Sequence, residues 1–114
     1  MLSAIPVLLS LDVPASVNFY TTKLSFICIY QEVGFAILQR DNIQLHFTYC
    51  DEQHLVDWSS CRVKVEGVDA LYEEASIHGI VHPNASLEDT DYRTREFSIV
   101  DLHGVLITFF ERKL

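Results

Sequence analysis

The chain of 114 residues has the length of one compact domain, and its 49% hydrophobic content is enough to fill a core of that size. The formal net charge is −8 and lysine and arginine form no run, so the basic patch that nucleic-acid binding requires is missing. Three cysteines without CxxC spacing, no signal-peptide pattern and apolar runs too short for a bilayer predict a soluble protein of the cytoplasm.

The first half of the chain predicts one helix and four strands. A near-continuous apolar run at residues 5–11 is typical of a strand that is buried on both faces. Asp12 and Pro14 then begin a helix, whose apolar residues recur at the spacing of one helical face. This face consists of Val13, Val17, Tyr20 and Leu24. Further strands are expected at residues 26–31, 35–39 and 43–49.

The second half repeats this plan after a polar, irregular linker at residues 51–58. A strand is expected at residues 60–65, followed by a helix that Gly79 ends as a C-cap residue. A short strand near residues 80–81 comes next. The segment 83–95 is longer and more polar than its counterpart in the first half, and a loop of that length is often a binding loop.

The last hairpin indicates that the two halves are a tandem duplication. Residues 97–100 and 105–110 are rich in β-branched and aromatic residues, and Gly104 in the turn between them is free to adopt positive φ. Moved back by 62 positions, from Phe97 to Phe35, the hairpin aligns with the first half without a gap. The single predicted domain, residues 1–114, accordingly contains repeats at about 4–50 and 59–112.

Three motifs in this order resemble a known superfamily. They are I-P-V-L-L-S-L-D-V-P-A-S-V-N-F-Y at residues 5–20, V-E-G-V-D-A-L-Y at residues 65–72, and the R-E-F hairpin with its V-D and Gly turn at residues 95–104. The pattern resembles the vicinal oxygen chelate superfamily of glyoxalase I, extradiol dioxygenases and bleomycin-resistance proteins, and it is most similar to the bleomycin-resistance branch. The usual turn of the family is Asp-Pro-Asp-Gly, which this chain replaces by Asp-Leu-His-Gly.

The resemblance implies an α+β fold in which tandem βαβββ repeats form a curved mixed sheet with a cleft, while the helices cover the outer face. In bleomycin-resistance proteins the clefts form between the two chains of a dimer. We therefore expect a homodimer that binds a small organic ligand, with no nucleic-acid or membrane partner.

Alternation along the strands predicts which side chains face the cleft. On residues 60–65 the apolar side chains should face the helix, which leaves Arg62 and Lys64 on the cleft side, and the same rule places His46 there. The repeat adds two residues of the last strand, and two aromatic residues at the cleft edge are of the type that stacks on flat ligands. The predicted ligand-binding residues are His46, Trp58, Arg62, Lys64, Tyr92, Thr108 and Phe110.

Catalytic groups and metal ligands are not expected. Metal-dependent members of the superfamily hold their ion at four positions, which here carry Ile5, His46, Ser60 (Ser59 if the register slips) and Thr108. One imidazole cannot make the three-ligand site that catalytic zinc or iron requires. Cys28, Cys50 and Cys61 lack a motif that would activate them and are expected to be buried structural thiols. We predict no metal, no cofactor and no catalytic residue.

The leading hypothesis is a metal-independent binding protein that sequesters an organic compound, because sequestration needs shape, stacking and a few polar anchors. Arg62 and Lys64 favour an anionic or aromatic ligand, unless Glu66 or Glu96 offsets their charge. The alternative is a glyoxalase-type isomerase, lyase or thiol transferase in which His46 is a general base. A third possibility is a protein that binds a partner and retains only a vestigial cleft.

Overall fold

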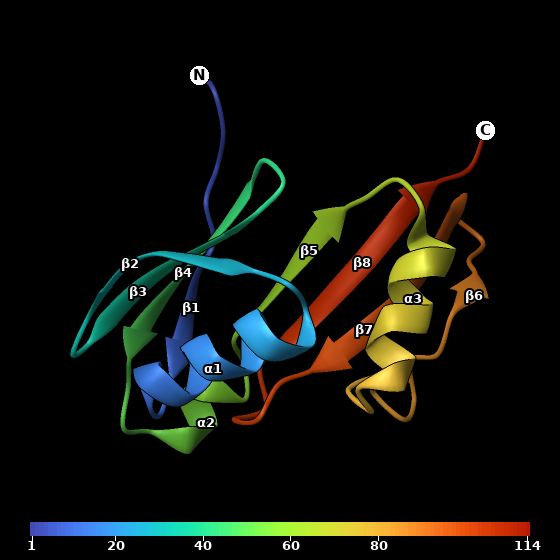
Figure 1. Cartoon of the computed structure of the whole chain (residues 1–114). Coiled ribbons are helices and arrows are strands. Elements are labelled where there is room, and N and C mark those ends of the chain that lie inside the picture. The colour runs from blue at the N-terminus through green and yellow to red at the C-terminus, as the bar shows by residue number, and fades with distance from the viewer. The chain divides into compact units, whose positions relative to one another are not determined.

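The computed structural model describes residues 1–114, and its strands form two four-stranded mixed sheets (Figure 1). The first sheet has the order β1-β4-β3-β2 and the second has the order β5-β8-β7-β6. In each sheet the first strand pairs in parallel with the last, and the other neighbours are antiparallel. Each sheet and its helix make one βαβββ repeat, which confirms the predicted α+β class with tandem repeats.

The secondary structure follows the predicted order closely. The first repeat contains β1 (Val7–Ser10), α1 (Val13–Lys23), β2 (Ile27–Glu32), β3 (Phe35–Arg40) and β4 (Ile43–Tyr49). Then follow α2 (Gln53–Val56), β5 (Ser60–Lys64), α3 (Val68–Ile77), β6 (Glu88–Asp89), β7 (Thr94–Val100) and β8 (Leu106–Arg112). The chain divides into two compact units, Met1–Ser59 with Leu102–Val105 and Ser60–Asp101 with Leu106–Leu114. None of the helices has the length and apolar character that crossing a membrane requires.

Helix α1 begins where the sequence predicts. The Asp12 side chain accepts a hydrogen bond from the Ala15 N–H at 3.2 Å, and Pro14 lies in the first turn. The helix packs on its sheet through Tyr20, which is fully buried and lies 4.9 Å from the Phe47 ring, centroid to centroid. The core of the first unit is therefore built around aromatic rings in edge-to-face and tilted contact.

Helix α3 is held at both ends by backbone geometry. Gly67 at its N-cap and Gly79 after its last turn have φ of +82° and +66°, a region that glycine adopts without strain. Glu111 on β8 accepts hydrogen bonds from the Gly67 and Val68 N–H groups at 3.2 and 3.1 Å. The Tyr72 ring lies 5.2 Å from the Phe97 ring, so α3 covers the face of the second sheet that carries Phe97.

The unusual turn after β7 belongs to the first compact unit. Gly104 has the predicted positive φ, at +103°. The Gln53 side chain donates to the His103 carbonyl oxygen at 2.8 Å, and His103 Nδ1 lies 3.3 Å from Ser16 Oγ. His103 therefore ties the turn to α1 through its ring and to α2 through its backbone carbonyl.

Four details differ from the sequence-based predictions. The first strand is shorter than residues 5–11, and only its alternate residues Leu8 and Ser10 are buried, so one face of the strand contributes to the core. The linker is not irregular throughout: it contains α2, whose Val56 is fully buried. Residues 80–81 form only an isolated bridge from Val81 to Ile99, and the edge strand β6 falls within the segment predicted as a loop. None of the cysteines is fully buried: Cys50 and Cys61 are half-buried, and Cys28 is exposed, because it lies on the edge strand β2, all of whose residues are exposed.

The two repeats do not align without a gap. The buried residues of the last strands, Leu45 with Phe47 and Ile107 with Phe109, are 62 positions apart as predicted. In the preceding strands, however, the buried residues are Ala36 with Leu38 and Phe97 with Ile99, which are 61 positions apart. Strand pairing gives the reason: Gln39 pairs with Gln44, whereas Val100 pairs with Leu106, so the second turn is one residue longer.

Candidate functional site

The candidate site lies on the face of the second sheet that points away from α3, here called the helix-free face. Alternation along β8 buries Ile107 and Phe109 on the α3 side and places Thr108 and Phe110 on the helix-free face. On β5 the same alternation buries Val63 and leaves Arg62 and Lys64 on the helix-free face. The strand faces were therefore predicted correctly from the sequence.

The Arg62 side chain extends from β5 across β8 toward β7. Its guanidinium carbon lies 4.6 Å from the centroid of the Phe110 ring, which is a stacking distance. Beyond that ring it reaches Glu96 on β7, where Nη2 donates to Oε1 at 3.1 Å and Nη1 donates to Oε2 at 3.4 Å. Three neighbouring strands thus each supply one member of an Arg62–Phe110–Glu96 stack.

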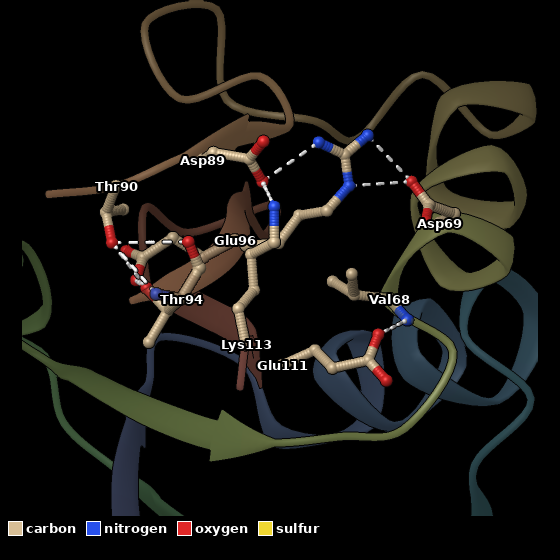
Figure 2. A network of polar contacts seen from close by, with 9 residues as sticks. Val68, Asp69, Asp89, Thr90, Thr94, Glu96, Glu111 and Lys113 are labelled. Carbon is tan, nitrogen blue, oxygen red and sulfur yellow. Dashed lines mark hydrogen bonds and ion pairs between the residues drawn. The ribbon is translucent and has the colours of Figure 1, made fainter. Parts of the chain in front are cut away.

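Glu96 is fixed from behind by two threonines. Thr94 Oγ1 donates to Glu96 Oε1 at 2.7 Å, and the hydroxyl groups of Thr94 and Thr90 are 2.8 Å apart. Figure 2 shows these three side chains linked in a row. The side chain of Glu96 is only 13% exposed, whereas that of Arg62 is 49% exposed. The carboxylate is therefore the anchored partner, and the guanidinium lies on the surface.

The electrostatics of the pair reflect these contacts. Hydrogen bonding to Glu96 raises the pKa of Arg62 above its ordinary value. Partial burial alone would raise the pKa of Glu96, but hydrogen bonds from Arg62, Thr94 and Tyr92 outweigh it and hold this pKa below the usual glutamate value. Both groups are therefore charged at neutral pH, and together they carry no net charge.

The other predicted residues of the second unit lie around this stack. Lys64 is exposed and pairs in register with Phe110, and Thr108 Oγ1 lies 2.7 Å from Ser98 Oγ. Tyr92 belongs to the loop before β7 and is one of the groups that affect the pKa of Glu96. Five of the seven predicted residues thus belong to this unit, and Arg62, Tyr92 and Phe110 are brought together.

The remaining two predicted residues belong to the first unit. His46 lies on the corresponding face of the first sheet, where its ring contacts Phe35 edge to face at 5.4 Å and Nε2 lies 3.4 Å from Gln44 Oε1. Trp58 follows α2 and is 86% exposed. Their part in ligand binding remains a prediction.

Glu96 and Ser98 are site residues that the sequence-based list lacks. Strand alternation contains the signal, since burying Phe97 and Ile99 toward the helix leaves Glu96 and Ser98 on the opposite face. The sequence suggests Glu96 only as an acid that could offset the charge of Arg62 and Lys64. Its pairing with Arg62 depends on the register of β5, β8 and β7, which alternation alone does not define.

No three or more His, Cys, Asp or Glu side chains are grouped so that they could hold a metal ion. The four positions that hold the ion in metal-dependent members of the superfamily carry Ile5, His46, Ser60 and Thr108. Ser59, the alternative to Ser60, instead accepts a hydrogen bond from the Leu9 N–H at 3.0 Å. The expectation of a metal-independent protein stays a prediction.

Comparison with known proteins first defines the class of fold. No protein-family model matches the chain. Its structure is similar to that of a bleomycin resistance determinant encoded on the transposon Tn5, with a TM-score of 0.87, 24% sequence identity and 100% coverage of both chains. The fold is therefore that of the bleomycin-resistance proteins.

More similar sequences then identify the family. The bleomycin resistance protein of Staphylococcus aureus is 33% identical over an alignment of 129 residues, which covers 98% of each chain. A bleomycin-binding protein from the bleomycin-producing Streptomyces verticillus, complexed with copper(II)-bleomycin, has 30% identity and a TM-score of 0.85 over 96% of this chain and 94% of that chain. This chain belongs to the bleomycin resistance protein family. The Streptomyces verticillus relative is a bleomycin-binding protein, which agrees with the predicted binding protein rather than the glyoxalase-type enzyme.

Proposed function

We propose that this protein sequesters bleomycin or a closely related organic compound, which it binds without chemical conversion. The observation that carries the proposal is the family membership, with a bleomycin resistance protein matched at 33% identity along 98% of the chain. The complex of a 30% identical relative with copper(II)-bleomycin supports the same ligand class.

The second unit offers a surface suited to this task. Phe110 and the Arg62 guanidinium supply flat stacking area, and Thr108 and Lys64 supply polar anchors on the same face. Threonine contacts fix Glu96 and, through it, Arg62, so the surface is organised before a ligand arrives. Preorganisation reduces the entropy lost on binding, which is what a tight sequestering protein needs.

Calorimetric titration of the purified protein with bleomycin and with copper(II)-bleomycin tests the proposal. We expect saturable binding of at least one form, and mass spectrometry of the recovered ligand should show an unchanged mass. Phe110→Ala should weaken binding, because it removes stacking area and the support of Arg62. Ile77→Ala is the matched control, since Ile77 is an exposed apolar residue of α3, the helix behind the sheet.

Two results would overturn the proposed function. Absence of saturable binding by the folded wild type would exclude sequestration of bleomycin. A ligand recovered with an altered mass would instead favour the enzyme alternative. Bacterial survival provides a further readout: expression of the wild type should permit growth at a bleomycin concentration that stops control cells.

We further propose that the protein is a homodimer of the cytoplasm. Large apolar side chains that a second chain could cover are exposed on the edge strand β2 and at the start of the chain, namely Ile5, Val7, Ile27 and Ile29. All three cysteines are free, as is common in a reducing compartment. Sedimentation equilibrium should give twice the mass of the chain, and a monomer at micromolar concentration would contradict the dimer.

A further inference from the structure

We propose that Arg62 recognises a ligand through the open face of its guanidinium, as a stacking surface for a flat, electron-rich aromatic ring, and not as a charge that pairs with an anion. The proposal deepens the proposed function and rests on it, because it specifies which part of an organic ligand the helix-free face binds. It also changes the role that the sequence suggested for Arg62, which was to favour anionic ligands.

The geometry of the planar group leads to this role. A guanidinium has two faces and an edge of N–H donors. The guanidinium carbon lies over the Phe110 ring at 4.6 Å, and two of the five N–H donors are directed at the Glu96 carboxylate. Because the side chain is still 49% exposed, we take the side turned away from Phe110 as the surface that a ligand can reach. A ring on that face would form the third layer of a stack above Phe110.

The edge is not readily released to an anion. A ligand carboxylate could take these two N–H donors only by displacing Glu96, whose Oε1 also accepts the 2.7 Å hydrogen bond from Thr94. Thr94 is itself buried and contacts the Thr90 hydroxyl at 2.8 Å, so Glu96 cannot move without disturbing this row. Charge selection on this face therefore falls to Lys64, which is exposed and forms none of the salt bridges found in this unit.

The exposed guanidinium of Arg62 also defines the chemical class of the ligand group. The flat face of a guanidinium attracts the negative face of an aromatic π system, and arginine stacks on such rings better than lysine does. A flat heteroaromatic ring, neutral or weakly charged, satisfies this requirement. An isolated carboxylate or phosphate satisfies it less well, because it offers no flat π face and would have to share the N–H donors with Glu96 and Tyr92.

Three substitutions separate the plane of Arg62 from its charge. Arg62→Lys keeps the positive charge and removes the plane, Lys64→Gln removes the neighbouring charge, and Glu96→Gln weakens the hold on the N–H edge. Each variant is titrated with three probes: bleomycin, 9-aminoacridine as a flat cation, and acridine-9-carboxylate as a flat anion of similar shape. Urea unfolding of each variant verifies that it is folded.

Stacking on Arg62 predicts a distinct pattern of affinities. Arg62→Lys should weaken both acridines about ten-fold, which corresponds to about 1.4 kcal/mol, whatever the sign of their charge. Lys64→Gln should alter only the preference between the two acridines. Glu96→Gln should strengthen binding of the carboxylate probe several-fold relative to the cationic one, because the freed edge can then accept an anion.

Other results would overturn the role of Arg62. If Arg62→Lys binds both acridines as well as the wild type does, the plane is not used. If the loss is confined to the anionic probe, Arg62 acts as a charge. If Arg62→Lys does not fold, the Glu96→Gln variant tests the role of Arg62 by itself. An unchanged preference between the anionic and the cationic acridine would then exclude the proposal. A wild type that binds the acridines and not bleomycin would exclude the proposed function while supporting the stacking role.

Discussion

Glu111 on the neighbouring strand β8 should stabilise the protein by capping the N-terminus of α3. The first N–H groups of a helix have no partner within the helix, and the N-cap residue Gly67 has no side chain to provide one. Both carboxylate oxygens of Glu111 take this role, at 3.2 Å from the Gly67 nitrogen and 3.1 Å from the Val68 nitrogen; Figure 2 shows the contact with Val68. Glu111→Ala removes both acceptors and a negative charge beside the positive end of the helix dipole.

The expected loss can be derived from these contacts. Removing an N-terminal cap typically costs about 0.5–2 kcal/mol, and a carboxylate near a helix N-terminus contributes about 0.3–1 kcal/mol. We therefore expect Glu111→Ala to lower the free energy of unfolding by about 1–2 kcal/mol. An unfolding entropy of about 2.1 cal/mol/K per residue amounts to about 240 cal/mol/K for this chain, so Tm should fall by roughly 4–8 °C.

Urea and thermal unfolding followed by far-ultraviolet circular dichroism measure this loss. Glu111→Gln should fall between the wild type and Glu111→Ala, because it keeps an acceptor oxygen and loses the charge. Glu73→Ala is the control, since Glu73 is an exposed residue of the same helix, and it should change stability by no more than about 0.5 kcal/mol. Equal midpoints for Glu111→Ala and Glu73→Ala would refute the capping argument.

Two further predictions concern thiols and acid. Burial raises the pKa of Cys61 to about 11, so at pH 8 only about one Cys61 thiol in a thousand is ionised. In a Cys50→Ser background, Cys61 should react with a disulfide reagent far more slowly than exposed Cys28, and adding Cys28→Ser should abolish the fast phase. Hydrogen bonds from Lys113 and Arg95 lower the pKa of Asp89, so its contribution to stability should be present above about pH 4 and be lost as pH falls through that lowered pKa. Asp89→Asn should remove this part of the acid sensitivity in urea unfolding, and an unchanged pH profile would contradict the assignment.

The repeated fold could be predicted from the sequence because its signals are local. Alternation of apolar residues separates the faces of each strand, as Leu45 and Phe47 show on β4 and as Val63 shows on β5. Asp12 with Pro14 marks the start of α1, and positive φ at Gly104 fits the turn. Alternation alone predicts the faces that carry Arg62 and His46, and the repeat adds the face that carries Phe110.

What the sequence did not reveal depends on pairing between segments far apart in the chain. Arg62 and Glu96 are 34 positions apart, and only the register of β5 on β8 and of β8 on β7 brings their side chains together. The extra residue in the second turn has no apolar pattern of its own, so the alignment of the repeats misplaced β7 by one position. The sequence predicts a buried Cys28, because an apolar strand at the edge of a sheet has the same residue pattern as a buried strand.

Comparison of the two repeats shows where the duplicated halves have diverged. Strand register matches Arg62, Phe110 and Glu96 in the second sheet with Val7, Thr48 and Phe35 in the first.

Behind each sheet the matched positions stay apolar, because both helices must pack on a close-packed core. On the helix-free faces no such packing limits the choice of side chain, and the three matched positions carry a charged stack in the second sheet and uncharged side chains in the first. Each repeat therefore keeps an apolar core of its own, and the two repeats present different chemistry on their helix-free faces.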